Sequence, residues 1–248
     1  MKKIAAVCCL FGCFTSLSSA QGDARVVKFR VLCYEHARDT LKGFVPGEGG
    51  GRDEVAFYTG GFGPQTSGKF ADGKARFFIE KPGPDGKPVP TVVAEGKLGP
   101  SAVQVFLLFP EAKDSALVYK VVAFDDLEAS FPMGSTRVIN LATFPIRLSL
   151  AGTEMPPIKP GGLQVYPQVK QVDDWNMFSA RIDFGVGEDK WVPVATQSWK
   201  ASDRKRDWVI THIDPNTKEP ALRLYQDIPP WRETKLEVGT AGGGGKNP

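Results

Sequence analysis

The part of this chain best suited to binding chemistry is a basic run between two tryptophans. Residues 200–207 read Lys-Ala-Ser-Asp-Arg-Lys-Arg-Asp, and Trp199 and Trp208 stand on either side of them. Guanidinium groups pair with anionic groups, and indole rings offer flat faces on which ligands stack. We therefore predict a contact surface for an anionic glycan or another envelope component, formed by Trp199, Arg204, Arg206, Trp208 and Trp231.

A second interpretation of the same run stays open. Asp203 and Asp207 lie among the cations and weaken the positive field. A solvated loop between two strands, with both tryptophans turned toward the core, would have the same sequence. The exposure of the tryptophans decides between the two interpretations.

Residues for metal or serine chemistry are sparse. The two histidines, His36 and His212, are far apart in the sequence, and no His-x-x-x-His pair occurs. Zinc sites depend on such spacings, so we expect no metal and no cofactor. A ligand set of His36 with Glu35 and Asp39 is the conceivable exception. No G-x-S-x-G elbow is present, and two histidines leave few ways to build a triad.

Carboxylates occur as two adjacent pairs, Asp125-Asp126 and Asp173-Asp174. Neighbouring residues of a strand point to opposite faces, so adjacent carboxylates do not share a site there. We predict that both pairs cap turns. The glycine-rich segment 47–52 lacks the Gly-Lys-Ser/Thr ending of a phosphate loop and predicts a flexible connection.

The first 20 residues have the layout of a secretory signal peptide. Lys2 and Lys3 precede an apolar run, and small residues end at Ala20, where a signal peptidase would cut. The run is too short for a membrane-spanning helix, which needs about 20 apolar residues. Leu-Phe-Gly-Cys at 10–13 also has the form of a lipobox, which would instead leave a lipid anchor on Cys13. Both alternatives predict export, to the periplasm or beyond.

Charge and cysteine content narrow the function classes. The chain has 31 basic and 28 acidic residues, and two of the basic ones lie in the signal segment. The chain after Ala20 is therefore nearly neutral and has no general electrostatic attraction to nucleic acid. Three of the four cysteines also precede Ala20, which leaves Cys33 without an intramolecular partner. In the predicted strand 26–34, Cys33 shares a face with Phe29 and Val31, and we expect it to be buried.

The rest of the chain predicts an all-β fold with few or no helices. Runs of Val, Ile, Phe and Tyr alternate with turn residues, and the chain has 27 glycines and 20 prolines. We predict two sandwich-like lobes of immunoglobulin or jelly-roll type, divided near residue 130. The domains are then 1–20, 21–130, 131–238 and a disordered glycine-rich tail, 239–248. The expected strands are 26–34, 55–58, 75–80, 91–95, 102–109, 117–125, 137–141, 146–150, 163–166, 178–186, 191–197, 208–213 and 221–225.

Three turn signals stand out in the middle of the chain. Gly134 permits a turn that a side chain would block. Asn140, at a strand end, can bond the backbone of the following turn. Pro160-Gly161 suits the two central positions of a type II turn.

The segment that carries these signals resembles a known group of proteins. Phe-Pro-Met-Gly-Ser-Thr-Arg-Val-Ile-Asn-Leu at 131–141 precedes Pro-Ile-Arg-Leu-Ser-Leu-Ala-Gly at 145–152 and Pro-Gly-Gly at 160–162. Over residues 120–165 this order resembles uncharacterised exported bacterial β-sandwich proteins. It is also similar to the small β-sandwich accessory proteins of exopolysaccharide acetylation. The resemblance implies an immunoglobulin-like sandwich and an envelope role, and it carries over no catalytic residue.

The sequence as a whole favours a non-catalytic envelope module for binding or assembly. Its expected partner is an envelope polysaccharide or protein, and we expect neither a nucleic-acid partner nor a transmembrane span. One alternative is a hydrolase that acts on an envelope polymer through an unfamiliar site. The other is a scaffold anchored to the membrane through lipidated Cys13.

Overall fold

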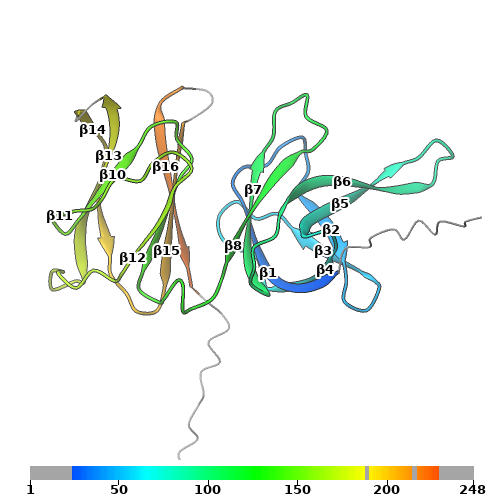
Figure 1. The fold of residues 1–248 in the computed structure, drawn as a ribbon, viewed down its shortest axis with the longest axis horizontal. Coiled ribbons are helices and arrows are strands. Elements are labelled where there is room, and N and C mark those ends of the chain that lie inside the picture. Colours follow the sequence, from blue (N-terminus) through cyan, green and yellow to red (C-terminus); the bar gives the residue numbers. More distant parts are fainter. Residues whose placement is uncertain (1–23, 188–189, 214–216, 229–248) are drawn as a thin grey trace, which may run out of the picture.

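All regular structure in the described part of the chain is β. The computed structural model describes residues 24–187, 190–213 and 217–228. These residues form sixteen strands and no helix, which confirms the predicted all-β class (Figure 1). The predicted signal peptide, the glycine-rich tail and Trp231 lie outside the described residues.

The strands fall into two groups along the chain. The first eight are β1 (Arg25–Cys33), β2 (Lys42–Pro46), β3 (Arg52–Ala56), β4 (Thr66–Phe70), β5 (Lys74–Pro82), β6 (Pro88–Lys97), β7 (Val103–Pro110) and β8 (Tyr119–Asp125). The last eight are β9 (Thr136–Asn140), β10 (Ile146–Leu150), β11 (Thr153–Glu154), β12 (Leu163–Tyr166), β13 (Met177–Gly187), β14 (Lys190–Lys200), β15 (Arg206–Ile213) and β16 (Pro220–Asp227).

The first eight strands form one curved sheet, which we call the N-terminal lobe. Its order is β3-β2-β5-β6-β8-β7-β1-β4, and the sheet curls into a nearly closed barrel. Its inner face holds apolar side chains such as Phe29, Val31 and Cys33 of β1. We expected two facing sheets here. A sheet that curls this far encloses its own core and needs no second sheet.

The last eight strands form the C-terminal lobe, a sandwich of two four-stranded sheets. One sheet has the order β11-β10-β13-β14 and the other β12-β9-β15-β16. Ile146, Leu148 and Leu150 alternate inward from β10 and meet Val138 and Val209 of the facing sheet. The period-2 pattern of this segment therefore places its apolar side chains in the sandwich core.

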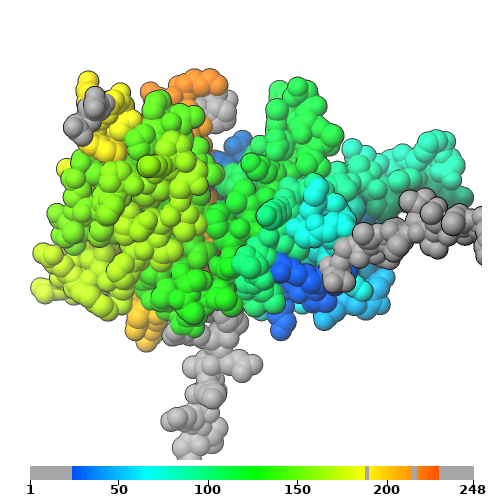
Figure 2. Space-filling model, viewed as in Figure 1, coloured from blue at the N-terminus to red at the C-terminus, as the bar shows by residue number. Residues whose placement is uncertain are grey.

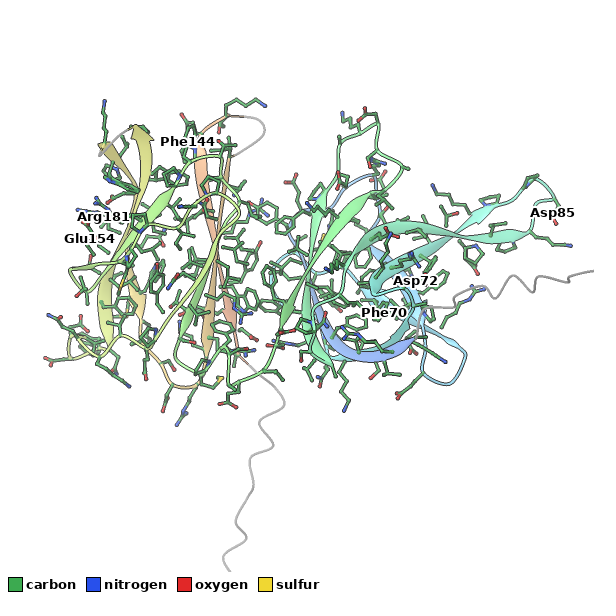
Figure 3. The ribbon with its side chains drawn as sticks, in the orientation of Figure 1. Phe70, Asp72, Asp85, Phe144, Glu154 and Arg181 are labelled. Carbon is green, nitrogen blue, oxygen red and sulfur yellow. The ribbon has the colours of Figure 1, made fainter. Side chains whose placement is uncertain are left out.

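The two central strands of the β12-β9-β15-β16 sheet, β9 and β15, are buried on both faces. The second face of this sheet packs on the outside of the barrel, where Trp208 and Ile210 of β15 meet Leu32 of β1 and Leu107 of β7. All five residues of β9 are buried, and so are the first six of β15. Side chains fill the space between the lobes in Figure 3, so the lobes share one continuous apolar interface.

Buried charges close one end of this interface. Arg30 of β1 and Arg206 of β15 bind the carboxylates of Asp126 and Asp227, and all four side chains are at most 4% exposed. We had predicted that the pair Asp125-Asp126 caps a turn. Asp125 does accept a hydrogen bond from the backbone of Ser101, but Asp126 is an interface residue.

The predicted turn chemistry is present. Gly134 and Gly161 have φ angles of 81° and 72°, in the region that favours glycine. Asn140 is fully buried, and its carboxamide accepts from the backbone N–H of Ala142 and donates to the carbonyl oxygens of Phe144 and Ile158. These bonds fix the path of the chain between β9 and β10.

Candidate functional site

Two of the predicted binding residues, Trp208 and Arg206, lie in the interface between the lobes. Trp208 is fully buried, and its ring meets Phe131 edge-on at 5.3 Å between centroids. Arg206 is 2% exposed and is held by Asp126 and Asp227. Positions 206, 208 and 210 share the face of β15 that the N-terminal lobe covers. These two side chains therefore cannot meet a ligand at the surface in this structure.

Trp199 is also an interior residue. It is 5% exposed, packs edge-on against Phe178 and donates its indole N–H to the side-chain oxygen of Gln197 at 3.1 Å. For both described tryptophans of the predicted site, the core interpretation of the basic run is thus the correct one.

The burial of charge beside Trp208 has an electrostatic consequence. The Arg137 guanidinium lies over the rings of both Phe131 and Trp208, 4.2 and 4.6 Å from their centroids. Burial, together with the neighbouring charge of Arg206, lowers the pKa of Arg137 to about 10. The group stays cationic at neutral pH, and the aromatic faces stabilise its charge in place of water.

Arg204 is the predicted residue that reaches the surface. It lines a pocket of about 430 Å³ between the turn after β14 and the loop that joins β12 to β13. Lys170 and Lys200 line the same pocket, against one carboxylate, that of Asp203. Within the described residues, Lys200 and Arg204 have no ion-pair partner. We call this hollow the basic pocket.

Backbone hydrogen bonds hold both walls of the basic pocket in place. Asp173 accepts the backbone N–H groups of Trp175 and Met177, which is the turn-capping role that we predicted for it. The N–H of Ala201 donates to the carbonyl of Asn176 and so ties the two walls together. The pocket is therefore formed before any ligand arrives, which lowers the entropy cost of binding.

Trp175 is the aromatic residue that our sequence reasoning missed. Its side chain is 79% exposed, and it precedes Asn176, which lines the basic pocket. The local sequence, Asp-Asp-Trp-Asn, could have predicted its exposure. Its neighbours are turn-forming residues, which give the tryptophan no apolar side chains to pack on. A tryptophan this exposed leaves its indole face open to a ligand that stacks on it.

The two histidines line a second hollow, where the lobes meet. His36 follows β1 and His212 belongs to β15, and the cleft between them has a volume of about 590 Å³. Glu35 and Glu111 are its carboxylates, and none of its described lining residues is Ser, Thr, Cys or Asp. No group of three or more potential metal ligands occurs among the described residues, the set of His36, Glu35 and Asp39 included.

Cys33 is buried as predicted. Its thiol faces the barrel interior and donates to the carbonyl oxygen of Glu35 at 3.2 Å. Burial raises the pKa of this thiol to about 11, so it remains protonated at neutral pH.

Comparison with known proteins does not assign this chain to a family. No model of a protein family matches the chain, and a search of curated proteins finds no matching sequence. Over the described residues, no helix is long and apolar enough to cross a membrane.

Proposed function

We propose that this chain is an exported, non-catalytic module of a bacterial envelope that binds an acidic polysaccharide at the basic pocket. The observation that carries the proposal is the pairing of Lys200 and Arg204, two cations without carboxylate partners in the described chain, with the exposed ring of Trp175 nearby. Cations attract uronate or phosphate groups, while an indole face stacks on the C–H face of a sugar ring.

The remaining lining suits the neutral parts of a sugar. Gln168, Asn176 and Ser202 place amide and hydroxyl groups around the basic pocket, where they can exchange hydrogen bonds with sugar hydroxyls. In the alternative, an assembly role, the basic pocket would instead contact another envelope component. The pocket is shaped and charged for a ligand, and this favours the glycan.

Binding to a polyuronate tests the proposal. Oligosaccharides of alginate should bind the wild-type chain, and neutral dextran oligosaccharides of equal length should not. The double substitution Lys200→Glu and Arg204→Glu should weaken alginate binding by at least about tenfold, since each lost ion contact contributes roughly 1 kcal/mol. Binding should also weaken as salt rises from low to physiological strength.

Two further variants make this test specific. Trp175→Ala should weaken binding by about fivefold or more, and Trp175→Phe by less, because a smaller ring still stacks. Lys87→Glu is the matched control, since Lys87 is exposed on the β5–β6 hairpin, in the other lobe. Equal losses for the control and the double variant, or equal binding of dextran, would refute the proposal.

The proposed export is tested at the N-terminus. Cleavage after Ala20 gives a chain that begins at Gln21, while lipidation gives a membrane-bound chain that begins at acylated Cys13. Intact mass of the soluble and membrane fractions distinguishes the two products. An uncleaved chain in the cytoplasm would contradict both routes.

A further inference from the structure

The cleft between the lobes has the properties of a second ligand site. Residues 34–38 after β1 and 109–113 at the end of β7 form one side, and His212 and Ile213 of β15 form the other. Figure 2 shows a notch on the upper side of the molecule between the C-terminal lobe and the green residues that follow β7. Its volume, about 590 Å³, lies within the range of sites for small organic ligands.

An aromatic wall lines this cleft. The rings of Tyr34 and Phe109 lie 5.4 Å apart, and the imidazole of His212 meets Tyr34 edge-on at 4.8 Å. Ala37, Pro110 and Ile213 add further apolar surface. Tyr34 itself is 6% exposed, with the Arg223 guanidinium 3.9 Å over its ring, so Phe109 offers the aromatic face on which a flat ligand ring can pack.

Hydrogen bonds fix the two sides of the cleft. Arg38 donates to the carbonyl oxygens of Ala112 and Ser115 and thereby joins the 35–40 segment to the turn between β7 and β8. Across the cleft, the Tyr34 hydroxyl lies 2.6 Å from Nδ1 and 2.5 Å from Nε2 of His212. The buried ions at the other end of the interface hold the lobes in one relative position.

The polar groups of the cleft indicate the charge of its ligand. Glu35 and Glu111 balance Arg38 and Lys113, so the field favours neither an anion nor a cation. Nε2 of His36 lies 2.6 Å from the carbonyl oxygen of Phe57. A carbonyl only accepts hydrogen bonds, so Nε2 carries a proton, and Nδ1 is the ring nitrogen that can accept from a ligand hydroxyl.

We infer that this cleft binds an uncharged ligand of two or three rings that carries a hydroxyl group, the chemical class of phenolic polycycles. The rings pack on Phe109, Pro110 and Ile213, and the hydroxyl donates to Nδ1 of His36. This site is separate from the basic pocket in both its residues and its chemistry.

Titration of the full-length chain with 2-naphthol tests the inference, and 2-methoxynaphthalene serves as the matched probe without a hydroxyl proton. We expect one 2-naphthol per chain, with a Kd of about 0.1–1 mM for a ligand of this size. 2-Methoxynaphthalene should bind about five to ten times more weakly, because it cannot donate a hydrogen bond.

Two variants locate the bound probe. His36→Phe keeps a ring and removes the acceptor, so it should abolish the preference for 2-naphthol and leave 2-methoxynaphthalene binding unchanged. Loss of both probes in this variant would contradict the assigned role of His36. Ile213→Glu, which puts a charge on the apolar wall, should weaken both probes at least tenfold in a chain that still unfolds cooperatively.

Any one of three results with the naphthalene probes would overturn the inference. These are no saturable binding of 2-naphthol, equal affinity for the two probes in the wild-type chain, and full 2-naphthol affinity in the Ile213→Glu variant. Preferential binding of methyl glucoside over 2-naphthol would also overturn it, because the ligand class would then be a sugar. The Lys200→Glu and Arg204→Glu double variant should bind 2-naphthol normally, so the outcome is independent of the basic pocket.

Discussion

Arg30 of β1 donates two hydrogen bonds to the carboxylate of Asp227 on β16, at 2.6 and 3.0 Å, although the residues are 197 positions apart. Arg206 binds the same carboxylate, and Asp126 of the segment between the lobes bridges both arginines. The four charges belong to both lobes and to the chain that connects them. The lobes are therefore joined by a closed ionic network as well as by apolar packing.

Removing one charge from this network should destabilise the whole molecule. Asp227→Asn keeps the shape of the side chain but leaves two buried guanidinium groups with one carboxylate. We expect the free energy of unfolding in guanidinium to fall by about 3–5 kcal/mol. Glu80→Gln is the control, because its pair with Arg52 is about half exposed and should contribute less than about 1 kcal/mol. Equal effects of the two variants would show that the network does not stabilise the fold.

The same carboxylate should make stability depend on pH. Burial by itself would raise the pKa of Asp227, but the hydrogen bond from Arg30 and the charges of Arg30 and Arg206 outweigh it and lower the pKa. The folded-state pKa thus lies below the unfolded value of about 3.9. This stabilisation is present above the unfolded pKa and is lost as pH falls through the folded one.

Urea unfolding between pH 2 and pH 6 measures this loss. The free energy of unfolding should fall more steeply with acid in the wild-type chain than in Asp227→Asn, which has no carboxyl group to protonate there. Parallel curves for the two chains would count against the pKa shift.

Asn140 should be among the least replaceable residues of the C-terminal lobe. Asn140→Ala leaves the N–H of Ala142 and the carbonyl oxygen of Phe144 without their side-chain partner, while the carbonyl of Ile158 keeps the backbone N–H of Ile146. Since each buried polar group without a partner costs about 1–3 kcal/mol, we expect a loss of at least about 2 kcal/mol. Gln164→Ala, on the exposed part of β12, should change the free energy of unfolding by less than about 0.5 kcal/mol. A loss no larger than this control would contradict the prediction.

Cys33 should behave as an inert core residue. In a full-length chain with Cys8, Cys9 and Cys13 replaced by Ser, it is the remaining thiol. Because burial raises its pKa to about 11 and blocks access, the native chain at pH 8 should react with a thiol-specific disulfide reagent roughly 100-fold more slowly than the unfolded chain. Rapid labelling of the native chain would show that the barrel opens around β1.

The strands that were predictable are those with strong local patterns. Ile146–Leu150 and Leu163–Tyr166 match the predicted ranges, and Asp85-Gly86 marks the turn of the β5–β6 hairpin, whose tip is labelled at Asp85 in Figure 3. The missed strands are Lys42–Pro46, Thr66–Phe70 and Thr153–Glu154. The first two strands contain glycine and the third has only two residues, so their intrinsic β-propensity is low. Hydrogen bonding to neighbouring strands, rather than local sequence preference, makes them strands.

The candidate site was predicted only in part, because contacts between distant parts of the chain decide which of its side chains reach the surface. The sequence places Arg204 and Trp208 near one another, but they point to different environments. Arg204 lies in a turn and reaches solvent, while Trp208 lies in a strand whose outer face is covered by the other lobe. Trp175 lies 29 positions before Arg204 in the numbering. The pairing of Met177 with Lys200 in the β13–β14 ladder, together with the bond from Ala201 to Asn176, brings its loop to the same place.

The amino-acid sequence by itself determined the strand periodicity, the main turns and the burial of Cys33, because these depend on neighbours along the chain. The tertiary structure decided the curling of the first sheet into a barrel and the covering of the second face of the β12-β9-β15-β16 sheet. A period of two residues states which side chains share a face, and it is silent on whether that face meets water or protein. Contacts between residues as distant as Arg30 and Asp227 settle that question, and with it which tryptophans and arginines can meet a ligand.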